Sequence, residues 1–86
     1  KQYLMGLRSF LEEDRRNILY SGAGDSVSED MLFILDSFIS AVANCEIKNI
    51  KVLFIAYKYA HLHLRKIKLR YSEVEELLID HGIINE

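Results

Sequence analysis

The sequence predicts an all-α protein made of a short helix, a long helix and a short helix, and three observations support this. From Ser28 to Arg65 the chain contains neither glycine nor proline, and its apolar residues recur at steps of three and four, as in an amphipathic helix. The capping-box spacing, a Ser with a Glu three residues later, occurs at Ser9, Ser26 and Ser72, each time before an apolar-periodic segment. Proline is absent from the whole chain.

These signals divide a single domain, residues 1–86, into an N-terminal extension and three helices. Gly6 lowers the helix propensity near the start of the chain, so the first helix is expected to begin after it. Gly22 and Gly24 tolerate the left-handed geometry that ends a helix, and Gly82 is well placed just past the last helix. The predicted segments are an extension over 1–8, a first helix over 9–20, a long helix over 26–65 and a last helix over 72–81.

The length of the central helix is the main question about function. A continuous helix over Ser28–Arg65 would measure about 57 Å at 1.5 Å per residue, whereas a compact chain of this size has a radius of gyration of about 12 Å. Either the helix is interrupted near residues 44–49 or ends before residue 65, or another chain covers its surplus length. Hydrophobic residues make up 50% of this small chain, which favours association with a partner.

The composition argues against an enzyme, a metal protein and a membrane protein. Cys45 is the only cysteine in the sequence, and its place on the apolar face is typical of a buried small hydrophobe. His61 and His63 would point about 200° apart on a helix, which is not a metal-ligand spacing. The apolar runs are shorter than the roughly 20 residues that cross a bilayer, and no phosphate-binding loop is present. We therefore expect no catalytic residue, metal or cofactor.

A basic cluster, Arg65, Lys66, Lys68 and Arg70, follows the long segment. Ile67 and Leu69 alternate with it, which predicts a short extended piece with these two side chains turned inward. A solvated loop is the ordinary interpretation of the cluster, and contact with DNA phosphates is the alternative. The net charge of −2 argues against strong binding to nucleic acid, so any DNA contact is expected to be weak.

Several stretches of the chain are similar to one known family. FISAVANCEI (38–47) resembles the middle of the long helix in the histone-fold family of the tenth TBP-associated factor, a subunit shared by TFIID and SAGA. LRYSEVEELLIDHGI (69–83) resembles its second loop and third helix, and RRNILYSGAGDSVSED (15–30) is a looser counterpart of its first helix and loop. YLMGL (3–7) resembles the apolar segment before the first helix. The resemblance implies a histone fold with an extended region between the long helix and the second loop.

The resemblance also implies a function. The chain would be a non-enzymatic nuclear subunit in transcription initiation, forming a heterodimer within TFIID or SAGA. Its partner would be another histone-fold protein: TBP-associated factor eight or three, or the histone-fold scaffold subunit of SAGA. The residues expected at this partner interface are Phe38, Val42, Cys45, Ile50, Leu53, Tyr57, Ile67, Leu69, Val74, Leu77 and Leu78.

A stand-alone four-helix bundle, monomeric or self-dimerising, remains an alternative. It would form if the long segment breaks near Asn44–Asn49 and its two halves pack as an antiparallel pair. Small adaptor and immunity-type binding proteins have this size and charge. Such a bundle is expected to be a soluble monomer by itself, whereas the histone-fold subunit is expected to aggregate without its partner.

Overall fold

The computed structural model describes residues 4–20, 26–63 and 71–85, with side chains over 4–20, 29–60 and 71–85. Within these ranges every regular element is helical, so the all-α prediction is confirmed. The expected extended piece between the last two helices lies outside the described residues. The helices are α1 (Met5–Tyr20), α2 (Ser26–Ala43), α3 (Ile47–His63) and α4 (Tyr71–Asp80).

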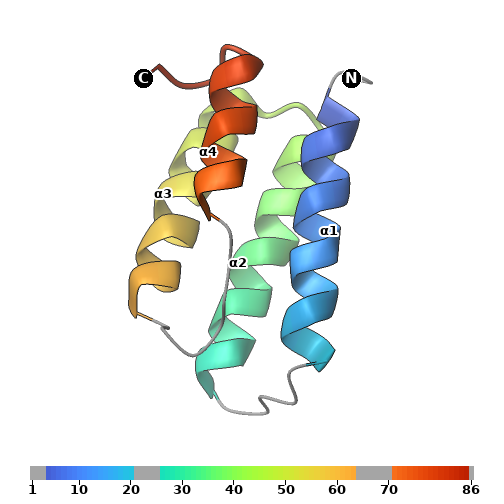
Figure 1. The fold of residues 1–86 in the computed structure, drawn as a ribbon, viewed down its shortest axis with the longest axis vertical. Coiled ribbons are helices and arrows are strands. Elements are labelled where there is room, and N and C mark those ends of the chain that lie inside the picture. The colour runs from blue at the N-terminus through green and yellow to red at the C-terminus, as the bar shows by residue number, and fades with distance from the viewer. Residues whose placement is uncertain (1–3, 21–25, 64–70, 86) are drawn as a thin grey trace.

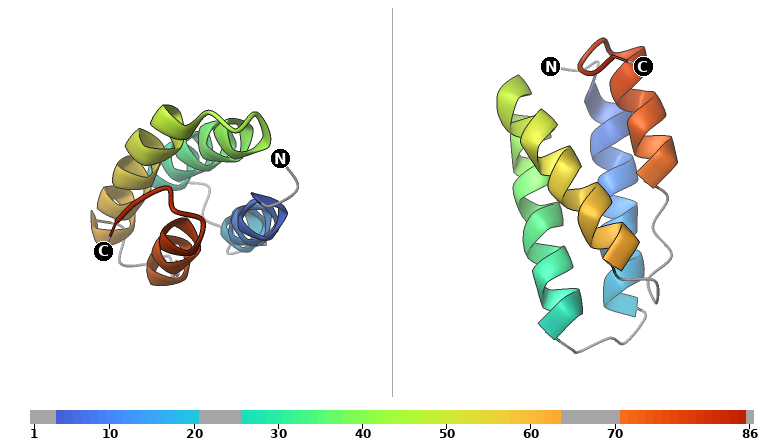
Figure 2. Two further views of the ribbon diagram at one scale, coloured as in Figure 1. Left: turned by 90° about the horizontal axis from the view of Figure 1, so that it is seen from above. Right: turned by 90° about the vertical axis from the view of Figure 1, so that its left-hand side faces the viewer.

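The helices form an up-and-down bundle in which each runs opposite to the one before it (Figure 1). α2 packs against α1 and α3, and α4 packs against α1 and α3, so the four helices enclose one interior. Figure 2 shows this arrangement from above and from the side. The start of α1, the α2–α3 connection and the end of α4 lie at the same end of the bundle (Figure 1). Its principal extents are 34 × 23 × 18 Å.

All four helices contribute to a single apolar core, whose members recur at three- and four-residue steps along each helix. Phe38 on α2 and Tyr57 on α3 meet near its centre in an edge-to-face arrangement, with ring centroids 5.8 Å apart. The buried apolar residues are Leu4, Leu7, Leu11, Ile18, Met31, Leu35, Phe38, Ala41, Val42, Ile50, Phe54, Tyr57, Val74, Leu78 and Ile83.

The first helix begins earlier than the sequence predicted. α1 is one uninterrupted helix from Met5, whereas we expected an extension over 1–8 and a helix start at Ser9. Leu4 and Leu7 are buried on the same side of the chain as Leu11. Burying a leucine contributes roughly 1.5–3 kcal/mol, which exceeds the cost of about 1 kcal/mol for a glycine inside a helix. The helix therefore continues through Gly6.

The long segment predicted over 26–65 is two helices. α2 ends at Ala43 and α3 begins at Ile47, so the interruption lies at residues 44–46, and α3 ends before residue 65. The two helices lie side by side and antiparallel (Figures 1 and 2). A continuous helix of about 57 Å would project well beyond the 34 Å bundle. Folding back lets both halves bury an apolar side in one core.

A Schellman motif closes α2. The Glu46 amide donates to the Ala41 carbonyl at 2.9 Å, and the Cys45 amide donates to the Val42 carbonyl at 3.1 Å. Cys45 has a φ of 55°, the left-handed conformation that this motif requires and that glycine usually supplies. The Glu46 carbonyl accepts the first hydrogen bond of α3, from the Ile50 amide at 2.9 Å. One turn therefore ends α2 and starts α3.

α4 ends in the same motif, here with the residue that the sequence indicated. Gly82 has a φ of 71°, and its amide donates to the Ile79 carbonyl at 2.9 Å. The Ile83 amide donates to the Leu78 carbonyl at 2.9 Å, and the Ile83 side chain is buried against the core. Leu78 and Ile83 both belong to the core cluster, and they occupy the two positions whose hydrophobic contact often accompanies this cap.

Candidate interaction surface

The side chains expected at a partner interface mostly lie inside the chain's own core. Since they fill the interior of the bundle, another protein could reach them only if the helices separated. Ile67 and Leu69, from the same prediction, lie outside the described residues. The buried members are Phe38, Val42, Ile50, Tyr57, Val74 and Leu78, and the half-buried members are Cys45, Leu53 and Leu77.

The basic cluster predicted to contact phosphates, Arg65, Lys66, Lys68 and Arg70, also lies outside the described residues. Among the side chains that the structure describes, over residues 4–20, 29–60 and 71–85, no group of three His, Cys, Asp or Glu residues is placed to hold a metal ion. None of the described helices is long and apolar enough to cross a membrane.

Asp14 is a buried carboxylate that the sequence analysis did not single out. Only 1% of its surface is exposed, and its Oδ2 accepts a hydrogen bond from the Tyr57 hydroxyl at 2.6 Å. It occupies a core position on α1, three residues after Leu11 and four before Ile18. That spacing was the available signal, because it puts an acidic residue within the apolar stripe of an amphipathic helix.

The Asp14–Tyr57 pair connects α1 to α3 through the centre of the bundle. Removing either partner would leave the other buried polar group without this hydrogen bond, which costs roughly 1–3 kcal/mol. A reacting group needs access to its substrate, whereas both side chains are enclosed, with exposures of 1% and 0%. The pair therefore holds the helices in register, and the surface is where a function must be sought.

The outer face of α3 carries an exposed apolar stripe. Val52, Ile55 and Tyr59 are 64%, 56% and 62% exposed, whereas most large apolar side chains of the described residues are buried or half-buried. Their spacing of three and four residues puts them on one side of the helix, opposite the buried Ile50 and Tyr57. α3 is therefore apolar on two opposite sides, and the bundle covers only one of them.

Lysines accompany this stripe. Lys48 and Lys51 are exposed on α3, and the helix contains no acidic residue. The Lys58 side chain contacts α4. Its Nζ lies 3.6 Å from an oxygen of Glu75 and 5.5 Å from the centre of the Tyr71 ring, and both of these residues belong to α4. The outer face of α3 thus carries an apolar stripe, with Lys48 one turn before it and Lys51 on its flank. We refer to Lys48, Lys51, Val52, Ile55 and Tyr59 as the α3 outer face.

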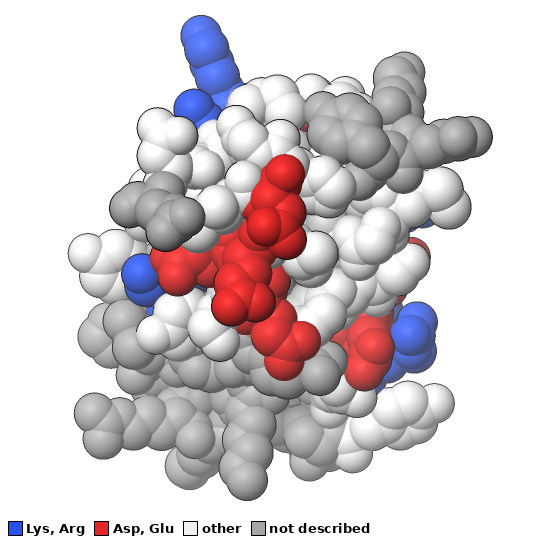
Figure 3. Space-filling model, turned by 45° about the horizontal axis from the view of Figure 1, so that its top comes forward, with Lys and Arg blue, Asp and Glu red and all other residues white. Residues whose placement is uncertain are grey.

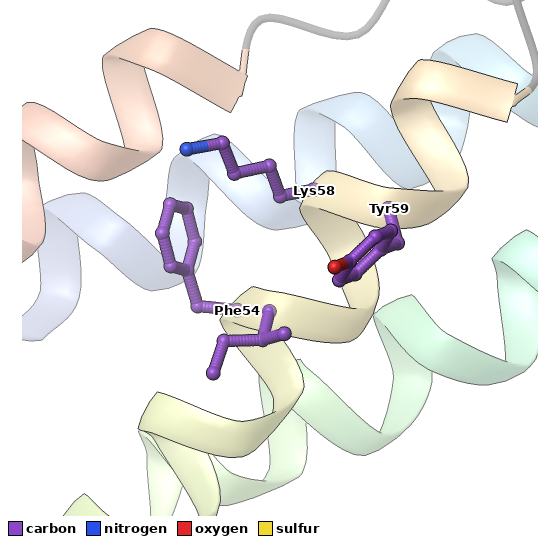
Figure 4. Close-up of a pocket in the computed structure, with 4 residues that line it drawn as sticks. Phe54, Lys58 and Tyr59 are labelled. Atoms are coloured by element: carbon purple, nitrogen blue, oxygen red, sulfur yellow. The ribbon is translucent and has the colours of Figure 1, made fainter.

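An open pocket of about 350 Å³ lies on this side of α3. It is lined by Phe54, Ile55, Lys58 and Tyr59, and Figure 4 shows these side chains projecting from successive turns of the helix. Three of the four side chains are apolar or aromatic, and the fourth, Lys58, carries an ammonium group that lies 3.6 Å from Glu75. Such a recess suits an apolar side chain that has a carboxylate beside it.

The exposed side of α4 has the opposite charge. Glu73, Glu76 and Asp80 are exposed at a spacing of three and four residues, which aligns them along one side of the helix. Figure 3 shows acidic side chains gathered near the middle of one face of the molecule. The charged side chains of α3 and α4 therefore have opposite signs, with lysines on α3 and carboxylates on α4.

Comparison with protein-family models, with curated proteins and with solved structures found no match to this chain. The function must therefore be inferred from the chain's own residues, above all from the α3 outer face.

Proposed function

We propose that this chain is a non-enzymatic binding protein of the adaptor or immunity type, which folds by itself and holds an acidic amphipathic helix of a partner protein on its α3 outer face. The supporting observation is the exposure of Val52, Ile55 and Tyr59 at helical spacing on a helix whose other side is already in the core. Helix recognition commonly uses apolar anchors at such a spacing.

The charge of the α3 outer face favours an acidic helix over two other occupants, a second copy of this chain and an anionic lipid surface. A second copy docked through the same face would bring its own Lys48 and Lys51 toward those of the first, and like charges oppose that contact. An anionic lipid surface would meet the lysines but also a chain whose net charge is −2. An amphipathic helix with Leu along one side and Glu beside it complements both the apolar stripe and the lysines.

The test uses a synthetic helical peptide with Leu at helical spacing and Glu at the flanking positions, and a second peptide with Lys in place of Glu. We expect the acidic peptide to bind, the basic one to bind at least about tenfold more weakly, and affinity for the acidic one to fall with added salt. NMR chemical-shift changes should map to α3. Equal binding of the two peptides, no binding of either, or shifts confined to other helices would refute the proposal. So would binding to anionic vesicles without binding to the peptide.

Phe33→Glu serves as the matched control for Ile55→Glu. Phe33 is 73% exposed on α2 and Ile55 is 56% exposed on α3, so both variants place a carboxylate on the surface without emptying the core. Removing a central apolar anchor typically weakens binding about tenfold, so Ile55→Glu should weaken peptide binding and Phe33→Glu should not. Thermal unfolding should be nearly unchanged in both variants, which separates binding from folding.

The second candidate is the nuclear histone-fold subunit of TFIID or SAGA that the resemblance implies. It requires α2 and α3 to join into one central helix, and the left-handed conformation of Cys45 favours that step, because a continuous helix would relieve it. Coexpression with TBP-associated factor eight or three, or with the SAGA scaffold subunit, should then give a one-to-one heterodimer and rescue an insoluble chain. A soluble monomer that forms no complex with these partners would exclude the histone-fold candidate.

A further inference from the structure

The connection between α2 and α3 is a short turn under backbone strain. Only residues 44–46 separate the two helices, and Cys45 adopts a φ of 55° although it has a side chain. Glycine visits this region freely, whereas other residues do so at a cost. From residue 26 to residue 65 the chain contains no glycine and no proline, so nothing in its local chemistry forbids a continuous helix.

Straightening this turn would exchange hydrogen bonds rather than lose them. The cap uses the amides of Cys45 and Glu46, which bond to the carbonyls of Val42 and Ala41. In a continuous helix the same amides would bond to the carbonyls four residues earlier. Cys45 would also leave the left-handed region. Packing between α2 and α3 therefore keeps the chain folded back at this turn, although the left-handed conformation of Cys45 disfavours it.

The molecule divides at this turn into two hairpins, α1–α2 and α3–α4. Each hairpin has internal ties: Arg15 Nε donates to Asp36 at 2.6 Å within the first, and Lys58 pairs with Glu75 within the second. The hairpins meet through α2 against α3 and α1 against α4.

Two buried contacts join the hairpins across this boundary. The Phe38 and Tyr57 rings pack edge to face, and the Tyr57 hydroxyl donates to Asp14. None of these interactions depends on whether both hairpins belong to the same chain. A second copy could therefore supply all of them.

We propose that two copies of this chain exchange their α3–α4 hairpins. Residues 44–46 become helical, α2 and α3 form one long helix, and each α1–α2 hairpin packs against the α3–α4 hairpin of the other copy. The two long helices then lie antiparallel and cross at Cys45. The dimer keeps the core of the monomer and relieves the strain at both turns, which is the arrangement called domain swapping.

The test compares two substitutions of Cys45 that shift the equilibrium between turn and continuous helix in opposite directions. Cys45→Ala favours the helical conformation, whereas Cys45→Gly favours the left-handed one. Because two turns straighten for each dimer formed, the dimerisation constant of Cys45→Ala should exceed that of Cys45→Gly by at least about 100-fold. Each variant is refolded from denaturant at high and at low protein concentration, and its mass is measured by light scattering. Equal dimer fractions for the two variants, or no dimer in either, would overturn the proposal.

Two controls separate exchange from simple surface contact. Gly82→Ala changes the equivalent residue of the α4 cap, where no further helix follows in the described chain, so it should not raise the dimer fraction. Ile55→Glu alters the α3 outer face and should leave an exchanged dimer intact. Exchanged dimers must open before they separate, so they should persist long after dilution. Rapid dissociation on dilution, or loss of the dimer in Ile55→Glu, would show a surface dimer and refute the exchange.

Discussion

The ends of α2 and α4 are closed by the same three hydrogen bonds but by different residues. At α2 the amides of residues 44, 45 and 46 donate to the carbonyls of 40, 42 and 41 at 3.0, 3.1 and 2.9 Å. At α4 the amides of residues 81, 82 and 83 donate to the carbonyls of 77, 79 and 78 at 3.1, 2.9 and 2.9 Å. The left-handed residue is Cys45 in the first cap and Gly82 in the second.

The residue after the left-handed position also differs between the two caps. Ile83 is 5% exposed and anchors the α4 cap to the core, whereas Glu46 is exposed and starts α3. The residues of the α4 cap, Gly82 and Ile83, thus favour its geometry by themselves. The α2 cap adopts the same geometry without it, so packing between α2 and α3 must maintain that turn.

The largest expected effect comes from weakening that packing. Phe38→Ala removes the ring that meets Tyr57 between α2 and α3, and large-to-small changes of this kind cost about 3–5 kcal/mol. Because a single core serves both helices, chemical denaturation should show a large loss of stability in one transition. A loss below about 1 kcal/mol would mean that the turn, and not the core, holds the hairpin together.

The next largest effect is a difference in stability between the two caps when the residue after the left-handed position is replaced by alanine. Ile83→Ala removes a buried anchor and should cost about 2–3 kcal/mol. Glu46→Ala removes an exposed side chain whose Oε1 accepts a 3.2 Å hydrogen bond from the Asn49 amide group, and should cost only about 0.5 kcal/mol. Both values can be read from urea unfolding curves. Equal costs for the two variants would remove this distinction between the caps.

A smaller loss is expected at Gly82 itself. A Cβ added at Gly82 would meet nothing within 4 Å, so Gly82→Ala is opposed only by its φ of 71°. The expected cost is about 1 kcal/mol. Thermal unfolding should show a correspondingly lower midpoint. An unchanged midpoint would indicate that the α4 cap relaxes to another conformation.

The smallest effect has the opposite sign. Cys45→Gly should stabilise the chain by about 0.5 kcal/mol, because glycine relieves the left-handed conformation but loses the half-buried sulfur and some chain stiffness. Cys45→Ala is the control, since it removes the sulfur and keeps the strain. Under dilute monomeric conditions the Gly variant should exceed the Ala variant by about 1 kcal/mol. The reverse order would show that the strain at residue 45 is negligible.

The sequence predicted α4 well and the region around the α2–α3 turn only as one of two alternatives. For α4 the acidic first turn and Gly82 are local signals that agree with the tertiary structure. For the turn, residues 44–46 hold no glycine or proline, so continuous helix and hairpin both agreed with the pattern. The α3 outer face was missed because periodicity shows that a helix has apolar sides but not which side another helix covers.

By itself the sequence determined that the chain is helical, that its apolar residues recur at helical spacing, and where the last helix ends. Only the tertiary structure decided that α1 runs through Gly6, that Asp14 is buried against Tyr57, and that the long segment folds back at Cys45. The physical reason is one of magnitude. Local preferences at Gly6 or Cys45 amount to about 1 kcal/mol each, whereas each large side chain buried in the shared core contributes roughly 1.5–3 kcal/mol.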